Sequence, residues 1–138
     1  MGYDSDNIFA RILRGEIPSY RVYEDADTFA FLDIMPRADG HLLVIPKTPA
    51  RNLLDATPAQ MAAVMVTVQK LARAAMQAFG ADGVTIQQFN ETAGGQEVFH
   101  LHVHVLPRIK DQPLRPPGTM ADSGLLQAHA EKLRAVLG

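Results

Sequence analysis

The apolar positions change their period along the chain, and this predicts several strands interrupted by one long helix. Alternation of apolar and polar residues predicts strands at 20–24, 28–33, 41–45, 84–89 and 98–106. A short helix is expected between Asp6, its cap, and Gly15, which stops it. A long helix is expected from Thr57 and Pro58 to Gly80. Runs of strands broken by one long helix indicate an α+β fold with an antiparallel sheet.

The long helix carries a continuous apolar stripe at helical spacing. Its members are Met61, Val64, Met65, Val68, Leu71, Ala72, Ala75, Met76 and Phe79. The polar residues Gln69, Lys70, Arg73 and Gln77 fall on the opposite side. We therefore expect the methionines to fill the core rather than to form a cofactor site.

The composition changes after Arg108, where prolines and a glycine predict an extended connector over 109–121. A final helix is expected over 122–138, capped by Asp122 or Ser123. Its apolar side consists of Leu125, Leu126, His129, Leu133, Val136 and Leu137. We expect this helix to pack on the domain or on a partner subunit and to shape one rim of the site, with His129 structural or exposed.

Composition limits the classes of function. A chain of 138 residues with 47% hydrophobic and 20% charged residues is expected to form a single domain, spanning 1–138. A net charge of −2 argues against a protein held on nucleic acid by a basic surface. The absence of cysteine excludes disulfide and thiolate chemistry. Without a signal-like start or an apolar run of membrane length, we expect a cytoplasmic enzyme with no membrane partner.

Three of the five histidines lie in one segment, as His100, His102 and His104. On a strand these side chains would project together, because successive residues point to opposite faces. Such a stripe is compatible with the polar face of a half-buried strand. It is also compatible with a metal site, or with an active site in which one imidazole attacks phosphorus and the others position the anion. Spacing alone does not choose between the last two.

The loop before the histidines favours the phosphorus chemistry. It contains the pair Gly94 and Gly95, which lets backbone amides approach a ligand, and amide N–H groups bind anions rather than cations. Taken alone, the glycine pair would indicate an ordinary turn. Glu91 and Glu97 leave a metal site open, but neither has a diagnostic ligand spacing.

These residues resemble the signature of the histidine triad (HIT) family. The shared features are Asn90, Gly95 with Gln96, the three alternating histidines, and the Leu106-Pro107 pair that follows them. The resemblance extends upstream through 7–18, 29–34 and 40–47. It implies the HIT fold, a five-stranded antiparallel sheet packed with helices. It also implies a homodimer, which in the family often joins through the long helix and the sheet edge.

The resemblance also implies roles for the histidines. His102 would be the nucleophile that attacks the α-phosphorus of a nucleotide, forming a nucleotidyl-histidine that water cleaves. His100 and His104 would bind phosphate oxygens or hold the nucleophile, and His41 would orient the triad.

The resemblance implies a nucleotide-binding surface as well. Asn90 and the amides of Gly95, Gln96, Glu97 and Val98 would contact the phosphate. Asp33 would accept hydrogen bonds from the ribose hydroxyls. An apolar slot for a purine base would consist of Ile8, Phe9, Ile12, Phe31 and Ile34.

One departure concerns metal. Many bacterial relatives hold a structural zinc through two cysteines, a histidine and the first triad histidine. Here Asn7, Ala10 and Pro49 occupy the first three positions, and a single imidazole does not hold tetrahedral zinc. We predict no zinc and no cofactor, with packing around Ala10 and Pro49 in its place.

Two classes of function remain. The first is a nucleotidyl hydrolase or transferase acting on a purine nucleoside phosphoramidate or a dinucleoside polyphosphate. The amino-terminal motif resembles the phosphoramidase branch, while Leu106-Pro107-Arg108 also occurs in the dinucleotide-hydrolase branch. The second is a nucleotide-binding regulatory protein with slow or incidental turnover.

Overall fold

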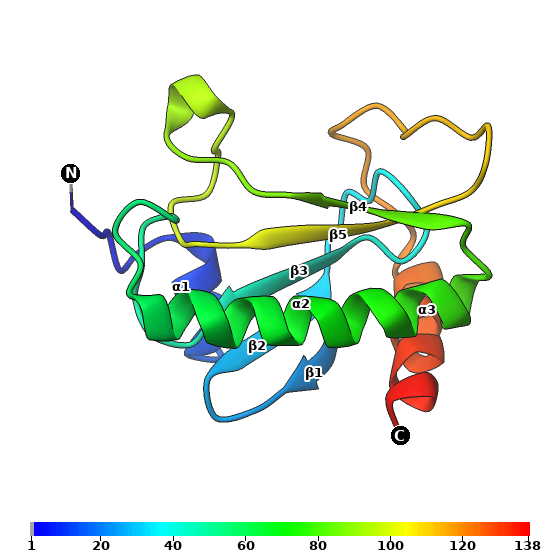
Figure 1. Cartoon of the computed structure of the whole chain (residues 1–138), viewed down its shortest axis with the longest axis horizontal. Helices are drawn as coiled ribbons and strands as arrows, with labels where there is room; N and C mark the ends of the chain where they lie inside the picture. The colour runs from blue at the N-terminus through cyan, green and yellow to red at the C-terminus, as the bar shows by residue number, and fades with distance from the viewer. Residues whose placement is uncertain (1) are drawn as a thin grey trace.

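The computed structural model describes residues 2–138, whose five strands form one antiparallel sheet in the order β1-β2-β3-β5-β4 (Figure 1). The strands are Arg21–Glu24 (β1), Thr28–Leu32 (β2), Leu42–Pro46 (β3), Gly83–Gln87 (β4) and Val103–Arg108 (β5). The helices are Ile8–Leu13 (α1), Pro58–Phe79 (α2) and Ser123–Leu137 (α3), with a short 3-10 turn at Thr92–Gly94 (η1). The expected α+β architecture with its five-stranded sheet is confirmed.

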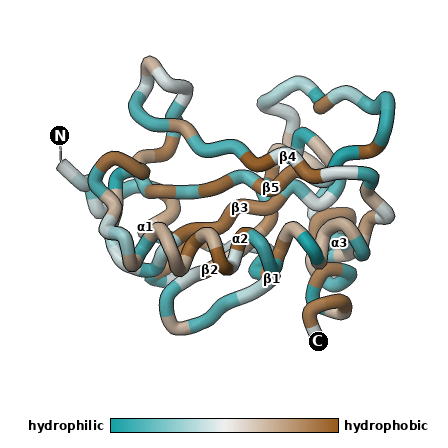
Figure 2. Tube along the Cα trace, in the orientation of Figure 1, coloured by the Kyte–Doolittle hydropathy of each residue, from teal (hydrophilic) through white to brown (hydrophobic). Residues whose placement is uncertain are grey.

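The two faces of the sheet are covered by different helices. Side chains on one face pack with α2 and α3 into the main core, which includes Ala30, Leu32, Leu42, Val44, Val103 and Val105. Side chains on the other face form a smaller cluster with α1: Phe9, Phe29, Phe31, Leu43 and Ile45. In Figure 2 the central strands β3 and β5 are mainly hydrophobic, as burial on both faces requires. Because side chains alternate along β5, His104 lies on the α1 face.

Helix α2 begins and ends where the sequence predicts. The Thr57 hydroxyl accepts from the Gln60 amide while the Gln60 side chain accepts from the Thr57 amide, which completes a capping box. Gly80 closes the helix in the left-handed region, at φ 57°. The placement of two methionines in the core was wrong, because Met65 is 50% exposed and Met76 is 36% exposed. Only one side of α2 contacts the sheet, so fewer of its apolar residues are buried than the sequence pattern predicted.

The caps of the other helices refine the sequence-based expectations. The cap of α1 is Asn7 rather than Asp6, since the Asn7 side chain accepts the Ala10 amide at 2.9 Å. Asp122 caps α3. Leu126, Ala130 and Leu133 of α3 are buried in the main core, whereas Leu125, expected on its apolar side, is 46% exposed. None of the helices within residues 2–138 is long and apolar enough to span a membrane.

The last strand is shorter than expected. The predicted strand 98–106 begins only at Val103, so His100 and His102 lie in irregular backbone before it. The Leu101 amide donates to the carbonyl of Ala50, which lies outside the sheet, at 2.8 Å. The alternation of apolar and polar residues does not reveal that the chain leaves the sheet here, because Leu101 is buried as it would be in a strand.

Candidate active site

Three histidines form a row on the α1 face of the sheet. The rings of His102 and His104 have centroids 5.1 Å apart, and those of His104 and His41 are 5.2 Å apart. His41 immediately precedes β3, which pairs with β5 and so brings it beside His104. Phe9 of α1 meets His102 edge-on at 4.9 Å. The structure therefore brings together three of the four predicted catalytic histidines.

His102 presents one bare nitrogen. Its Nδ1 lies 2.7 Å from the backbone carbonyl oxygen of His100. A carbonyl oxygen only accepts, so Nδ1 carries the ring proton and Nε2 keeps its lone pair. Burial lowers the pKa of His102, although its bond to the His100 carbonyl partly opposes the shift. His102 is therefore a neutral imidazole with an unprotonated Nε2 at neutral pH.

His41 and His104 form a chain of hydrogen bonds that starts at a backbone amide. The Arg37 amide donates to Nδ1 of His41 at 3.1 Å, so the proton of His41 lies on Nε2. That nitrogen donates to Nδ1 of His104 at 2.9 Å. Burial is the main cause that lowers the pKa of His41 to about 4 and that of His104 to about 3. His104 therefore keeps its proton on Nε2, where it serves as a donor.

Asp33 lies beside this chain. Its Oδ1 accepts the Met35 amide at 2.8 Å, and Oδ2 is 3.6 Å from Nε2 of His41, which exceeds hydrogen-bond distance. Burial raises the pKa of Asp33, the Met35 amide partly opposes the shift, and the charge of Glu97 adds to it.

Asp33, His41 and His104 are close enough to surround a cation, with one candidate ligand atom from each lying within 4.8 Å of the others. The hydrogen bonds argue against that use. Because Nδ1 of His41 accepts the Arg37 amide, Nε2 must keep its proton and cannot offer a lone pair to a metal. These side chains therefore favour a chain of hydrogen bonds with fixed proton positions over a set of metal ligands.

His100 points away from the row. Its Nε2 donates to the Pro46 carbonyl at 2.9 Å, and its Nδ1 lies 2.6 Å from the Tyr3 hydroxyl. Burial lowers the pKa of His100 to about 4. Since both ring nitrogens are engaged, the ring does not reach a phosphate. Of the two roles expected for His100, the geometry favours holding the nucleophile, through its carbonyl.

The zinc position of bacterial relatives does not fit the residues found here. Asn7 uses its side-chain oxygen to cap α1, and Ala10 has no donor atom. Both nitrogens of His100 are already bonded. Pro49 is exposed, so the expectation that packing around it replaces the metal was wrong, whereas Ala10 is buried.

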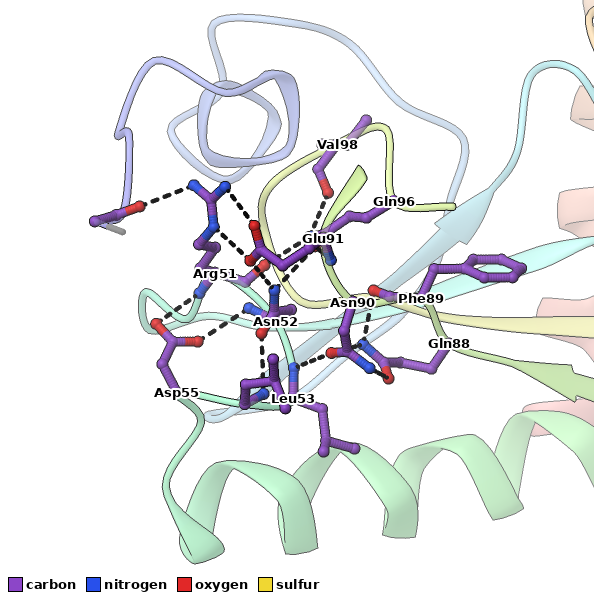
Figure 3. A network of polar contacts seen from close by, with 12 residues as sticks. Arg51, Asn52, Leu53, Asp55, Gln88, Phe89, Asn90, Glu91, Gln96 and Val98 are labelled. Carbon is purple, nitrogen blue, oxygen red and sulfur yellow. Dashed lines mark hydrogen bonds and ion pairs between the residues drawn. The ribbon is translucent and has the colours of Figure 1, made fainter. Parts of the chain in front are cut away.

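A polar network anchors the loop that precedes the triad (Figure 3). Nε and Nη2 of Arg51 donate to the two oxygens of Glu91 at 2.8 and 2.9 Å. The Gln96 side chain, 3% exposed, accepts from Asn52 and from the Glu91 amide. Its amide nitrogen donates to the carbonyls of Arg51 and Val98. Gln96 is thus an internal anchor of the loop, and its side chain has no capacity left for a substrate.

The loop offers fewer anion donors than the sequence suggested. The amides of Gly95 and Gln96 already donate to the carbonyls of Thr92 and Glu91, both at 3.0 Å. The amides of Glu97 and Val98 have no hydrogen-bond partner within residues 2–138.

Asn90 is also partly engaged. Its side-chain oxygen accepts the Leu53 amide and the Gln88 side-chain amide, both at 2.9 Å, and its nitrogen donates to Gln88 Oε1. One N–H of Asn90 remains for a ligand.

The predicted base slot is partly open. Phe9 and Phe31 are buried and meet edge-on at 5.3 Å, and Ile12 packs against their cluster. Ile8 and Ile34 are 45% and 40% exposed, so they offer apolar surface to a ligand.

Sequence reasoning did not single out Tyr3, Arg37, Arg51 or Asn52. The contacts of Tyr3 and Arg51 join positions 97 and 40 residues apart, and neither lies in a motif. Arg37 acts through its backbone amide, which any residue but proline provides.

Comparison with known proteins agrees with this geometry. A family model described as the HIT domain matches residues 14–111. The chain belongs to the HIT family. Similar proteins include one of Sulfolobus tokodaii described as a hypothetical histidine triad nucleotide-binding protein, and one of Arabidopsis thaliana named an adenylylsulfatase. Residues 112–121 of the connector and all of α3 lie beyond the matched residues.

Individual HIT proteins align closely with the chain. Protein hit of Bacillus subtilis is 43% identical over 101 residues, which are 73% of this chain and 70% of that protein. Adenylylsulfatase HINT3 of Arabidopsis thaliana is 36% identical over 104 residues, 75% of this chain but only 53% of that protein. The crystal structure of a HIT-like protein of Bartonella henselae, described as involved in cell-cycle regulation, has a TM-score of 0.95. It is 51% identical, with 99% of both chains covered.

Proposed function

We propose that this HIT protein is a nucleotidyl hydrolase or transferase that attacks the α-phosphate of a purine nucleotide derivative through His102. The observation that carries the proposal is the fixed tautomer of His102. Its Nδ1–H is bonded to the His100 carbonyl, and its Nε2 lone pair is free at neutral pH.

The reaction has two displacements at phosphorus. Nε2 of His102 forms a bond to the α-phosphorus, and the bond to the leaving group breaks. The leaving group departs with that electron pair and takes a proton from water. Water then attacks the nucleotidyl-histidine, the N–P bond breaks with its electron pair returning to Nε2, and the surplus proton passes to solvent. Throughout, the His100 carbonyl stabilises the positive charge that develops on the ring.

Several donors near His102 support the binding of a phosphate. Nε2–H of His104 lies next to His102 in the row. The amides of Glu97 and Val98, which have no partner in the part of the chain that the structure describes, belong to the loop leading into the triad. A single donor of this kind is worth roughly 2.7–4 kcal/mol in the transition state. Asp33 would accept from the ribose hydroxyls, and the apolar surface of Ile8 and Ile34 would hold the base.

The proposed substrates are purine nucleoside phosphoramidates and dinucleoside polyphosphates. The name of the Arabidopsis relative, an adenylylsulfatase, supports an adenylyl group as the transferred group. In a dinucleoside polyphosphate the leaving group on the α-phosphorus is a phosphate anion. In a phosphoramidate it is an amine, whose nitrogen takes a proton from solvent as the P–N bond breaks.

The test compares wild type with His102→Ala on adenosine 5′-phosphoramidate and on diadenosine polyphosphates. Loss of the nucleophile should lower kcat by roughly 1,000-fold or more. His129→Ala is the matched control, since His129 lies on α3 against Phe79 and away from the row. Mass spectrometry without acid should find a nucleotide adduct on His102. Equal turnover by wild type and His102→Ala would refute the nucleophile.

A second candidate is a nucleotide-binding regulatory protein with incidental turnover. The Bartonella protein described as involved in cell-cycle regulation favours it. This candidate predicts tight binding of a purine nucleotide, retained in His102→Ala, together with slow hydrolysis by the wild type. Isothermal titration beside the kinetics separates the two candidates.

We also propose a homodimer. β4 is an edge strand, and α2 exposes Met65, Val66 and Met76. An unpaired strand edge with apolar neighbours is suited to contact between two copies.

A further inference from the structure

The first residues of the described chain lie against the triad, although they are far from it in sequence. The Tyr3 hydroxyl is 2.6 Å from Nδ1 of His100, and the two rings meet edge-on with centroids 5.6 Å apart. The Gly2 carbonyl accepts a hydrogen bond of 3.1 Å from Nη1 of Arg51. Two contacts therefore hold this arm, residues 2–3, on the body of the protein.

Tyr3 is the donor in its bond to His100. Nε2 of His100 lies 2.9 Å from the Pro46 carbonyl, which only accepts, so Nε2 carries the single proton of the neutral ring. Nδ1 is then a bare acceptor in a residue that is only 1% exposed. Without the phenol, that acceptor would be buried with no partner, which costs free energy.

The effect of Tyr3 extends to the nucleophile through one residue. The hydrogen bonds to the two ring nitrogens of His100 fix its side chain, and the fixed side chain restricts the backbone of the same residue. That backbone lies before β5, so no ladder of strand pairing holds it. The His100 carbonyl receives Nδ1–H of His102 at 2.7 Å. The same peptide unit has a second anchor, since the Leu101 amide donates to the Ala50 carbonyl.

We propose that Tyr3 is a positioning residue, which holds through His100 the carbonyl that keeps the reactive nitrogen of His102 free and aimed. This inference rests on the proposed nucleophilic role of His102. Tyr3 acts through His100, so its loss should weaken the chemical step more than the binding of substrate.

The experiment uses Tyr3→Phe, which keeps the aromatic packing and removes only the hydroxyl. With adenosine 5′-phosphoramidate, kcat should fall roughly 3- to 10-fold, the size expected for one hydrogen bond, while KM stays within about twofold. Imidazole ¹⁵N chemical shifts should move His102 from the pure Nδ1–H tautomer toward a mixture of both tautomers.

The matched control is Tyr23→Phe. Tyr23 lies on the edge strand β1, where its hydroxyl donates to Asp25 at 2.9 Å and accepts from Lys70 at 3.1 Å. This variant also loses a tyrosine hydroxyl, but one remote from the triad. Its kcat and its His102 tautomer should match those of the wild type.

A Tyr3→Phe protein with wild-type kcat and an unchanged His102 tautomer would overturn the inference. If its melting temperature alone were lower, Tyr3 would be merely structural. If the wild type shows no turnover that depends on His102, the proposed function fails. The tautomer of His102 in Tyr3→Phe then decides the role of Tyr3 by itself: a mixture supports it and a pure Nδ1–H form refutes it.

Discussion

The reactivity that we propose for His102 depends on its protonation, and burial sets the pH range in which the ring is neutral. Burial lowers its pKa below the ordinary value of about 6.5. We therefore expect kcat/KM to stay level as pH falls to about 6.5 and to decrease only below it. A pH profile from about pH 8 to 4.5 tests this expectation. A decrease centred at or above the ordinary pKa of histidine would contradict it.

The same burial makes the stability of the fold depend on pH. The pH profile of kcat/KM therefore needs a control for unfolding. His41 and His100 have folded pKa values of about 4, below the value in an unfolded chain, so the unfolded state binds more protons between the two values. Their contribution to the free energy of unfolding is present above about pH 6.5 and is lost as pH falls toward about 4. Circular dichroism at each pH separates loss of fold from protonation of His102.

At the residue scale, the sequence predicts which histidines lie close together better than it predicts their hydrogen-bond partners. The alternating histidines and the glycine loop could be recognised because they form a local pattern. The partner of each imidazole could not, because the tautomer of His102 depends on a backbone carbonyl and that of His41 on the Arg37 amide. Gln96 belongs to the expected signature, yet its side chain is used to hold the loop.

At the element scale, the contact of Gly40 with the end of α2 fixes the turn that carries His41. Gly40 has φ +80°, and a Cβ placed on it would overlap the ring of Phe79. Gly40→Ala should therefore lower the free energy of unfolding by roughly 2–4 kcal/mol, through strain in the left-handed region and overpacking. Urea denaturation followed by circular dichroism measures this loss.

Gly80→Ala separates the two causes. Gly80 is also left-handed, at φ +57°, but a Cβ there would meet no atom within 4 Å. This variant should lose only about 1 kcal/mol, the cost of the backbone conformation alone. Phe79→Leu should rescue part of the loss in Gly40→Ala, since it removes the ring that the Cβ meets. Equal losses in Gly40→Ala and Gly80→Ala would show that the overlap has no energetic effect.

Elements differ in how well the sequence defines their ends. Thr57, Pro58 and Gly80 marked both ends of α2 because caps are local chemistry. The start of β5 was misplaced, since alternation records which side chains are buried and not which amides join the sheet. In this chain, the misplaced stretch contains His100 and His102, whose backbone lies outside the strand and forms part of the candidate site.

At the scale of the whole molecule, the two faces of the sheet separate the main core from the candidate site. The α2 and α3 face contains the larger apolar core, while the α1 face contains the row of histidines beside a small aromatic cluster. The sequence predicts this sheet, but it does not show which side of α2 remains uncovered. Periodicity assigned Met65 and Met76 to the core, but both are exposed in the single chain. The apolar side of α2 that they belong to is therefore not explained by packing within one chain.

A dimer would explain that surface. Val66 of α2 is 66% exposed and Ile86 on the edge strand β4 is 42% exposed, so both offer apolar area on one chain alone. A stable interface buries roughly 1,200–2,000 Å² in total and excludes unpaired charge. We expect the wild type to have twice the 15.1 kDa mass of one chain in light scattering, and Val66→Glu to shift it toward the monomer. Met120→Glu is the matched control, because Met120 is 67% exposed but lies in the connector, and its variant should stay dimeric. A monomeric wild type, or a Val66→Glu protein that remains dimeric at low concentration, would assign the exposed side of α2 to something other than self-association.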